Sequence, residues 1–69
     1  MMKIKVFIET KNETRTIPVE QKATIASLLK KININPIEVV VAKNDEVVTE
    51  DEIIKDGDDI KIFSVVSGG

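Results

Sequence analysis

Two stretches of the chain, residues 3–9 and residues 59–66, alternate between apolar and polar positions. An alternation with a period of two is typical of a strand that buries one face. In both stretches isoleucine and valine occupy the positions of the face expected to be buried. Each stretch has one phenylalanine at a position of the opposite face, Phe7 in the first and Phe63 in the second. The pattern therefore predicts two strands whose phenylalanines point away from the core.

A second strand is expected at residues 14–19, after a turn at residues 10–13. The turn contains Asn12, a residue type that tolerates turn conformations. The first two strands would then form a hairpin. Pro18 has no backbone N–H to donate, so this strand is predicted to lie at an edge of the sheet.

One amphipathic helix is expected at residues 24–32. Its apolar side chains have the spacing of a single helical face, and they are Ile25, Leu28, Leu29 and Ile32. Thr24 is a suitable N-cap. Two lysines lie in the last turn, where cations interact favourably with the helix dipole, and Pro36 marks the end of the helical segment.

The remaining strands are shorter. A third strand is predicted at residues 37–43, followed by a turn at residues 44–46 and a short return strand at residues 47–49. One helix can cover one face of a mixed sheet of four to five strands, which gives a two-layer α+β domain.

Two turns precede the last strand. Residues 50–54 are expected to form a brief helical turn in which Ile53 and Ile54 are apolar anchors. Residues 55–58 contain Gly57 between two aspartates, a strong turn pattern that allows positive φ.

Composition excludes several kinds of site. The chain has 69 residues, enough for one small domain, and it contains neither cysteine nor histidine. Disulfides, zinc fingers and catalysis by cysteine or histidine are therefore excluded, and no metal site, resident cofactor or enzymatic activity is expected. Absence of tryptophan and tyrosine, together with a net charge of −2, argues against nucleic acid as a partner. The chain shows no membrane-spanning run or signal-like start, so a cytoplasmic location is expected.

Two of the three glycines are the last residues, Gly68 and Gly69, directly after the predicted last strand. An inert, small-residue end is one interpretation. The alternative is a reactive tail, in which residues 66–69 could extend roughly 13 Å, at about 3.3 Å per residue. A terminal carboxylate can be adenylated with ATP and then attacked by a sulfur or amine nucleophile, and glycine has no Cβ to crowd the reacting carbon.

The order of elements, the turn at residues 56–58 and the terminal sequence VSGG together resemble the ubiquitin-like β-grasp sulfur carriers of the ThiS/MoaD family. The resemblance covers essentially the whole chain. It implies a β-grasp domain over residues 1–65 with a flexible tail over residues 66–69. It also implies that Gly69 is adenylated by an ATP-dependent adenylating enzyme and becomes a thiocarboxylate, with Gly68 as its flexible neighbour.

The short length and the VSGG end look more like the thiamin carriers, whose sulfur acceptor is thiazole synthase. The chain lacks the Asn-Gly turn and the later Pro-Arg pair usual in those carriers, since Asn44-Asp45 and Thr49-Glu50 stand at these places. A molybdopterin synthase small subunit, a carrier for transfer-RNA thiolation, a ubiquitin-like modifier joined to lysines and an interaction module with an inert tail remain as alternatives.

A partner-binding surface is expected on the sheet face opposite the helix. The resemblance places the first and last strands side by side, so Phe7 and Phe63 would share that face, with Val40 extending the patch. Scattered exposed apolar residues are the other interpretation. Residues that lead to the glycines are expected to contact the partner as well, and these are Val65, Val66 and Ser67. The free protein is expected to be a monomer.

Overall fold

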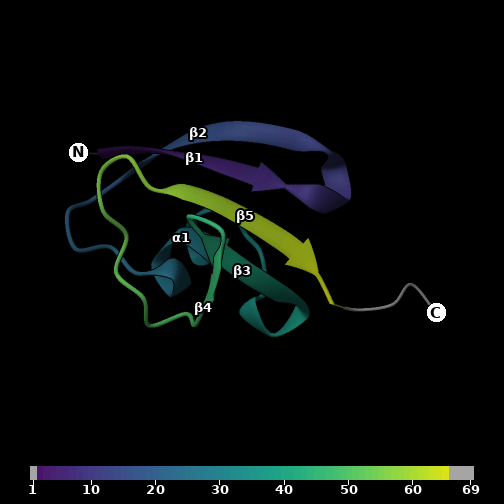
Figure 1. The fold of residues 1–69 in the computed structure, drawn as a ribbon. Coiled ribbons are helices and arrows are strands. Elements are labelled where there is room, and N and C mark those ends of the chain that lie inside the picture. The colour runs from purple at the N-terminus through teal and green to yellow at the C-terminus, as the bar shows by residue number, and fades with distance from the viewer. Residues whose placement is uncertain (1, 66–69) are drawn as a thin grey trace.

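A computed structural model describes residues 2–65; Met1 and residues 66–69 lie outside the described part. One helix packs on one face of a five-stranded sheet (Figure 1). The strands are β1 (Met2–Ile8), β2 (Glu13–Val19), β3 (Val39–Lys43), β4 (Glu46–Val48) and β5 (Asp59–Ser64). The helices are α1 (Ile25–Lys31) and two short 3₁₀ helices, η1 (Glu9–Lys11) and η2 (Pro36–Glu38).

The sheet has the order β2-β1-β5-β3-β4. β1 and β5 pair in parallel, and every other neighbouring pair is antiparallel. The predicted α+β class is therefore confirmed, and the first and last strands lie side by side at the centre of the sheet. A central strand is hydrogen-bonded on both sides, which fixes the position and direction of β5.

The hairpin and the helix start follow local chemistry. Asn12 has φ 48° and its N–H donates to the carbonyl of Glu9, which closes the turn before β2. β2 is an edge strand, as Pro18 predicted. The Thr24 side chain accepts from the N–H of Ser27, and the Ser27 hydroxyl accepts from the N–H of Thr24, so the helix begins with a capping box.

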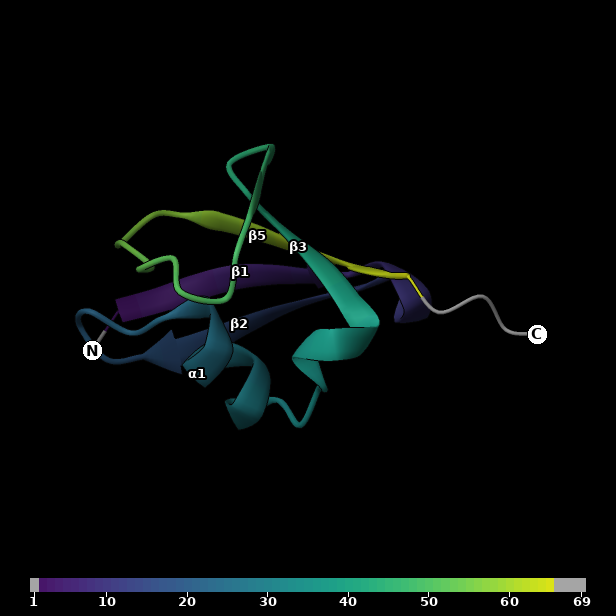
Figure 2. The same cartoon turned by 90° about the horizontal axis from the view of Figure 1, so that it is seen from below.

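The core lies between the sheet and α1. Its members are the apolar residues of the inward strand phase and of one helical face, joined by one loop residue. They are Ile4, Val6, Ile8, Ile17, Val19, Ile25, Leu28, Leu29, Val41, Ile54, Ile60 and Ile62. Figure 2, viewed from below, shows α1 on one side of the sheet only.

Two local predictions are wrong in part. The third strand starts at Val39 rather than at Ile37, because Asn35 accepts from the N–H of Ile37 and starts a 3₁₀ turn at Pro36. Residues 50–54 form only a single turn at Glu50 and Asp51, closed by the N–H of Glu52 on the carbonyl of Thr49, and no helix follows it. This segment lies against the start of α1, where the carbonyls of Glu50 and Glu52 accept the first helical N–H groups.

The segment also carries one apolar anchor instead of two. Ile54 is buried and donates its N–H to the carbonyl of Ala23, whereas Ile53 is 48% exposed and forms an isolated bridge to Thr24. An extended backbone points successive side chains to opposite sides, so only one of the two isoleucines can face the core. The return strand is confirmed with shifted bounds, Glu46–Val48.

Candidate functional site

The centre of the sheet carries the chain to its C-terminal residues. β5 pairs with β1 on one side and with β3 on the other. Beyond the strand, the N–H of Val65 donates to the carbonyl of Glu38 at 3.0 Å. Val65 is therefore held in place while its side chain is 54% exposed. The other residues expected to reach the partner or to carry sulfur lie outside the described residues, and they are Val66, Ser67, Gly68 and Gly69.

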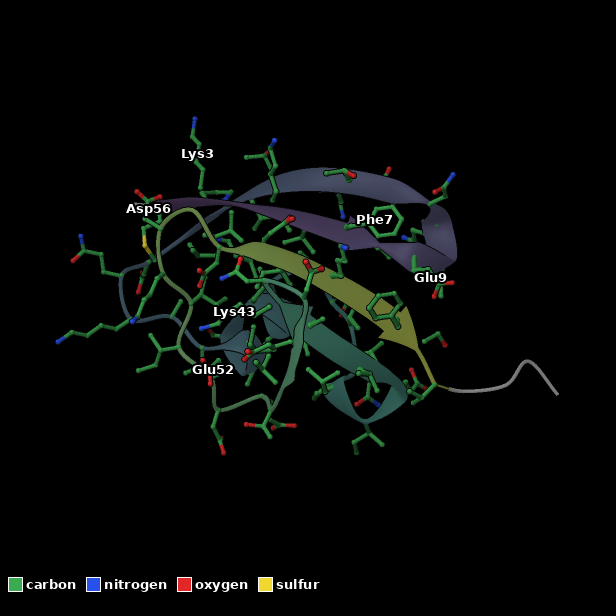
Figure 3. The ribbon with its side chains drawn as sticks, in the orientation of Figure 1. Lys3, Phe7, Glu9, Lys43, Glu52 and Asp56 are labelled. Carbon is green, nitrogen blue, oxygen red and sulfur yellow. The ribbon has the colours of Figure 1, made fainter. Side chains whose placement is uncertain are left out.

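The strand register brings three expected partner-binding residues to one face of the sheet. Phe63 lies directly opposite Val40 on β3. Phe7 lies opposite Lys61 on β5, two residues from Phe63 and therefore on the same face. All three apolar side chains are half-buried, and Figure 3 shows Phe7 on the side of β1 away from α1. The predicted outward phase of both phenylalanines is confirmed.

Two further exposed apolar residues were not expected, and one of them, Val47, borders this patch. Val47 on β4 is 75% exposed and lies opposite Ala42, which shares the outward phase of Val40. Ile37 on η2 is 83% exposed and precedes Glu38, the residue that holds Val65. Val47 therefore extends the apolar surface of the sheet face, whereas Ile37 lies on η2 beside the residue that holds Val65. We call Phe7, Val40, Phe63 and Val47 the sheet patch.

Charged residues surround the sheet patch. The ammonium of Lys61 lies 3.2 Å from a carboxylate oxygen of Asp45, and both side chains are exposed. Lys5 on β1 is the register partner of Asp59 on β5, on the same face. An apolar centre with a mixed-charge rim is the usual composition of a protein–protein interface.

The turn before β5 explains the two aspartates around Gly57. Gly57 has φ 86°, a conformation that favours glycine. A carboxylate oxygen of Asp58 accepts from the N–H of Lys55 at 2.7 Å. The turn is therefore closed by the side chain of Asp58, and it sets the first residue of β5.

Asp58 belongs to a polar network that joins this turn to the end of β3. Its other oxygen accepts from the side-chain amide of Asn44 at 3.0 Å. The ammonium of Lys43 lies 2.6 Å from an oxygen of Glu52 and 3.8 Å from Asp58, and its side chain is only 14% exposed. Figure 3 shows Lys43 and Glu52 pointing toward one another beside α1. The network fixes the start of β5 relative to β3.

This network shifts two pKa values in the directions that stabilise the charged forms. Burial by itself raises the pKa of Asp58, but the N–H of Lys55, the amide of Asn44 and the charge of Lys43 outweigh burial, and the pKa falls below its ordinary 3.8. The pKa of Lys43 is raised above 10.5, chiefly because its ammonium donates to Glu52. Both shifts have a structural explanation.

We expect Asp58→Asn to destabilise the protein at neutral pH and to weaken its sensitivity to acid. A hydrogen bond to a charged group contributes about 1.5–3 kcal/mol, and an amide in place of the carboxylate loses part of it. Because the folded-state pKa of Asp58 is below 3.8, its contribution is complete above that value and is lost as the pH falls through the folded pKa. The difference between wild type and variant should therefore shrink between pH 6 and roughly pH 2.

Urea unfolding across this pH range measures the effect. Asp56→Asn is the matched control, since Asp56 lies in the same turn with an exposed side chain. A wild-type-minus-variant difference that stays constant with pH would show that Asp58 is not stabilised as a carboxylate.

The described residues offer little else for chemistry. Within residues 2–65, no group of three or more acidic, histidine or cysteine side chains is arranged to hold a metal ion. No helix in that range is both long and apolar enough to cross a membrane.

Comparison with known proteins places this geometry in a family. The model of the ThiS family matches residues 4–69. Among solved structures, a protein described as molybdopterin converting factor, subunit 1, from Pyrococcus furiosus superposes with a TM-score of 0.78 at 22% identity, over 96% of this chain and 100% of that one.

A ubiquitin and a designed protein superpose almost as well. The ubiquitin of Caldiarchaeum subterraneum gives a TM-score of 0.75 at 19% identity, over 99% of this chain and 98% of the other. A designed protein based on ubiquitin gives 0.75 at 22% identity, over 97% and 92%. These similarities confirm the ubiquitin-like β-grasp fold that the sequence resemblance implied.

Proposed function

The chain belongs to the ThiS family, which supports a role as a sulfur carrier, and we propose that Gly69 is the residue that carries the sulfur. The family match extends to residue 69 and is the observation on which this proposal depends. The fold supports it as well. β5 is held on both sides, and the Val65–Glu38 hydrogen bond continues this support to the last described residue.

The proposed reaction has two steps, both on the C-terminal carboxylate. First, a carboxylate oxygen of Gly69 attacks the α-phosphate of ATP on a partner enzyme, and pyrophosphate leaves. Second, a hydrosulfide-level sulfur nucleophile attacks the acyl carbon, the bond to AMP breaks, and a thiocarboxylate and AMP are formed. Gly68 and Gly69 have no side chain that would crowd the tetrahedral intermediate.

The protein is thus a substrate of an adenylating enzyme rather than an enzyme itself. The chemistry needs an ATP site and an acid or base near the acyl carbon. A partner would supply these groups, and a second partner would accept the sulfur. We propose thiazole synthase of thiamin formation as that acceptor, because the family model is that of ThiS.

Two other assignments use the same activated carboxylate. A molybdopterin or transfer-RNA thiolation carrier differs only in the acceptor, and the Pyrococcus furiosus protein keeps the first of these open. A ubiquitin-like modifier would pass the acyl group to a lysine amine instead of to sulfur. The test is the species formed on Gly69: protein purified from its own cells should end in a thiocarboxylate, and thiazole synthase with its other substrates should discharge it.

We further propose that the sheet patch docks on the adenylating enzyme. Phe63→Asp is expected to weaken that complex at least about tenfold, because it places a charge in the apolar centre of the interface. Phe63 is half-buried, so the melting temperature should fall only by several degrees, at about 4–8 °C per kcal/mol lost.

Titration of the adenylating enzyme with each variant, beside thermal unfolding, measures both quantities. Thr16→Asp is the matched control, because Thr16 is exposed on edge strand β2 in the same outward phase as Lys5. If folded Phe63→Asp binds as tightly as Thr16→Asp, the sheet patch is not the docking surface.

A further inference from the structure

A cavity of about 560 Å³ opens at the pole where β5 ends, on the helical face of the sheet. Ile8 and Ile62 are buried and form part of its floor, and the half-buried Ile34 lies beside them. α1 ends at Lys31, so the loop after it and η2, rather than the helix, border this part of the inner face. The size of the cavity is that of sites that take a small group or a partner side chain.

The rim of the cavity carries two cations and one carboxylate, namely Lys11, Arg15 and Glu38. Arg15 has the inward strand phase of Ile17, so its side chain emerges on the cavity side of β2. Its contact with Glu13 is 3.7 Å between two half-exposed side chains, which is a weak surface pair. The guanidinium can therefore form a two-pronged contact with an incoming carboxylate.

The cavity lies beside the last described residues of the chain. Ser64, the last residue of β5, lines it, and Glu38 on its rim accepts the hydrogen bond from Val65. An enzyme that binds the residues after Val65 must lie against this pole. The sheet patch is on the opposite face of β5, so the cavity offers that enzyme a second, separate contact.

We propose that this cavity docks the enzyme that activates the C-terminus, and that it receives an apolar side chain flanked by a carboxylate. The apolar floor matches the side chain, and Lys11 with Arg15 matches the carboxylate. Contacts on both faces hold β5 between them and set the direction in which the following residues enter the active site. This inference rests on the proposed activation of Gly69.

Charge reversal at the rim tests the proposal. The double variant Lys11→Glu/Arg15→Glu should bind the adenylating enzyme at least about tenfold more weakly and raise KM in ATP–pyrophosphate exchange to a similar extent, with kcat retained. Lys3→Glu/Lys55→Glu is the matched control, because it makes the same charge change at exposed lysines beside a different cavity. The control should stay within about twofold of wild type.

A second variant tests the apolar part without changing charge. Ile34→Ser removes part of the wall, and because Ile34 is half-buried the protein should stay folded, which thermal unfolding verifies. Its KM should rise as well. Equal KM values for wild type, the rim variant and the Ile34 variant would overturn the proposal.

The two proposals fail in different ways. If wild type supports no exchange with its cognate enzyme, the activation of Gly69 is wrong. If wild type is active and the rim variant has the same Kd and KM, the docking inference alone is wrong. Tighter binding by the rim variant would mean that the protein's own C-terminus occupies the cavity, and loss of a dimer in sedimentation would assign the cavity to a second copy; either result would overturn enzyme docking.

Discussion

Deletion of Gly69 is expected to abolish ATP-dependent activation and to leave thermal stability unchanged. The reacting carboxylate would then belong to Gly68, one residue short of the active site, and a displacement of a single residue is about 3.3 Å. Misplacement by even 1 Å can reduce a rate about 100-fold. Within residues 2–65 the core cluster runs from Ile4 to Ile62, and glycine has no side chain to contribute to it.

ATP–pyrophosphate exchange with the cognate adenylating enzyme, beside a melting curve, measures the result. Gly69→Ala is the informative companion, because it keeps the chain length and the carboxylate but adds a Cβ at the reacting residue. Its exchange should fall between that of wild type and that of the truncated chain. Undiminished exchange by the truncated chain would refute the carrier function.

The parts of the fold that the sequence predicts well are those with a strong local pattern. The alternating stretches became β1 and β5 with the expected faces, and the helical spacing became α1 with Thr24 as its cap. The errors lie where tertiary contacts outweigh local pattern. Residues 50–54 look helical in isolation, but only a single turn forms at Glu50 and Asp51. The carbonyls of Glu50 and Glu52 instead satisfy the unpaired N–H groups at the start of α1.

The features of the candidate site likewise separate into those that local pattern predicts and those that depend on tertiary contacts. The outward phase of Phe7 and Phe63 follows from alternation alone, but their proximity depends on parallel pairing of the first and last strands. The exposure of Ile37 could not be foreseen from an apolar run that reads as a strand; the Asn35-Pro36 pair before it was the available signal of a 3₁₀ turn. The cavity is lined by residues from β1, β2, the loop after α1, η2 and β5, a relation between distant segments that no local pattern contains.

The other prediction with a large expected effect concerns the C-terminal carboxylate of Gly69, in which sulfur should replace one oxygen in the cell. We expect intact protein purified from its own cells to carry a C-terminal thiocarboxylate. Replacement of oxygen by sulfur adds nearly the same mass as one methionine oxidation, and Met1 and Met2 are candidates for oxidation. Trypsin resolves the ambiguity, because cleavage after Lys61 places residues 62–69 in a peptide that contains no methionine.

The composition of the chain makes alkylation selective for a C-terminal thiocarboxylate. There is no cysteine, so a thiol-directed alkylating reagent has no side-chain thiol to modify, and any adduct must lie at the C-terminus.

A protein modifier would behave differently: trypsin would leave the whole segment 62–69 as a branch on lysines of other proteins, because no lysine or arginine follows Lys61. Abundant branches without C-terminal sulfur would reverse the assignment from carrier to modifier. If neither the thiocarboxylate nor the lysine branch is found in sulfur-replete cells that contain the adenylating enzyme, the remaining assignment is an interaction module with an inert tail. An alkylated peptide 62–69 that disappears in the Gly69 deletion, with lysine branches absent, is the result that a sulfur carrier requires.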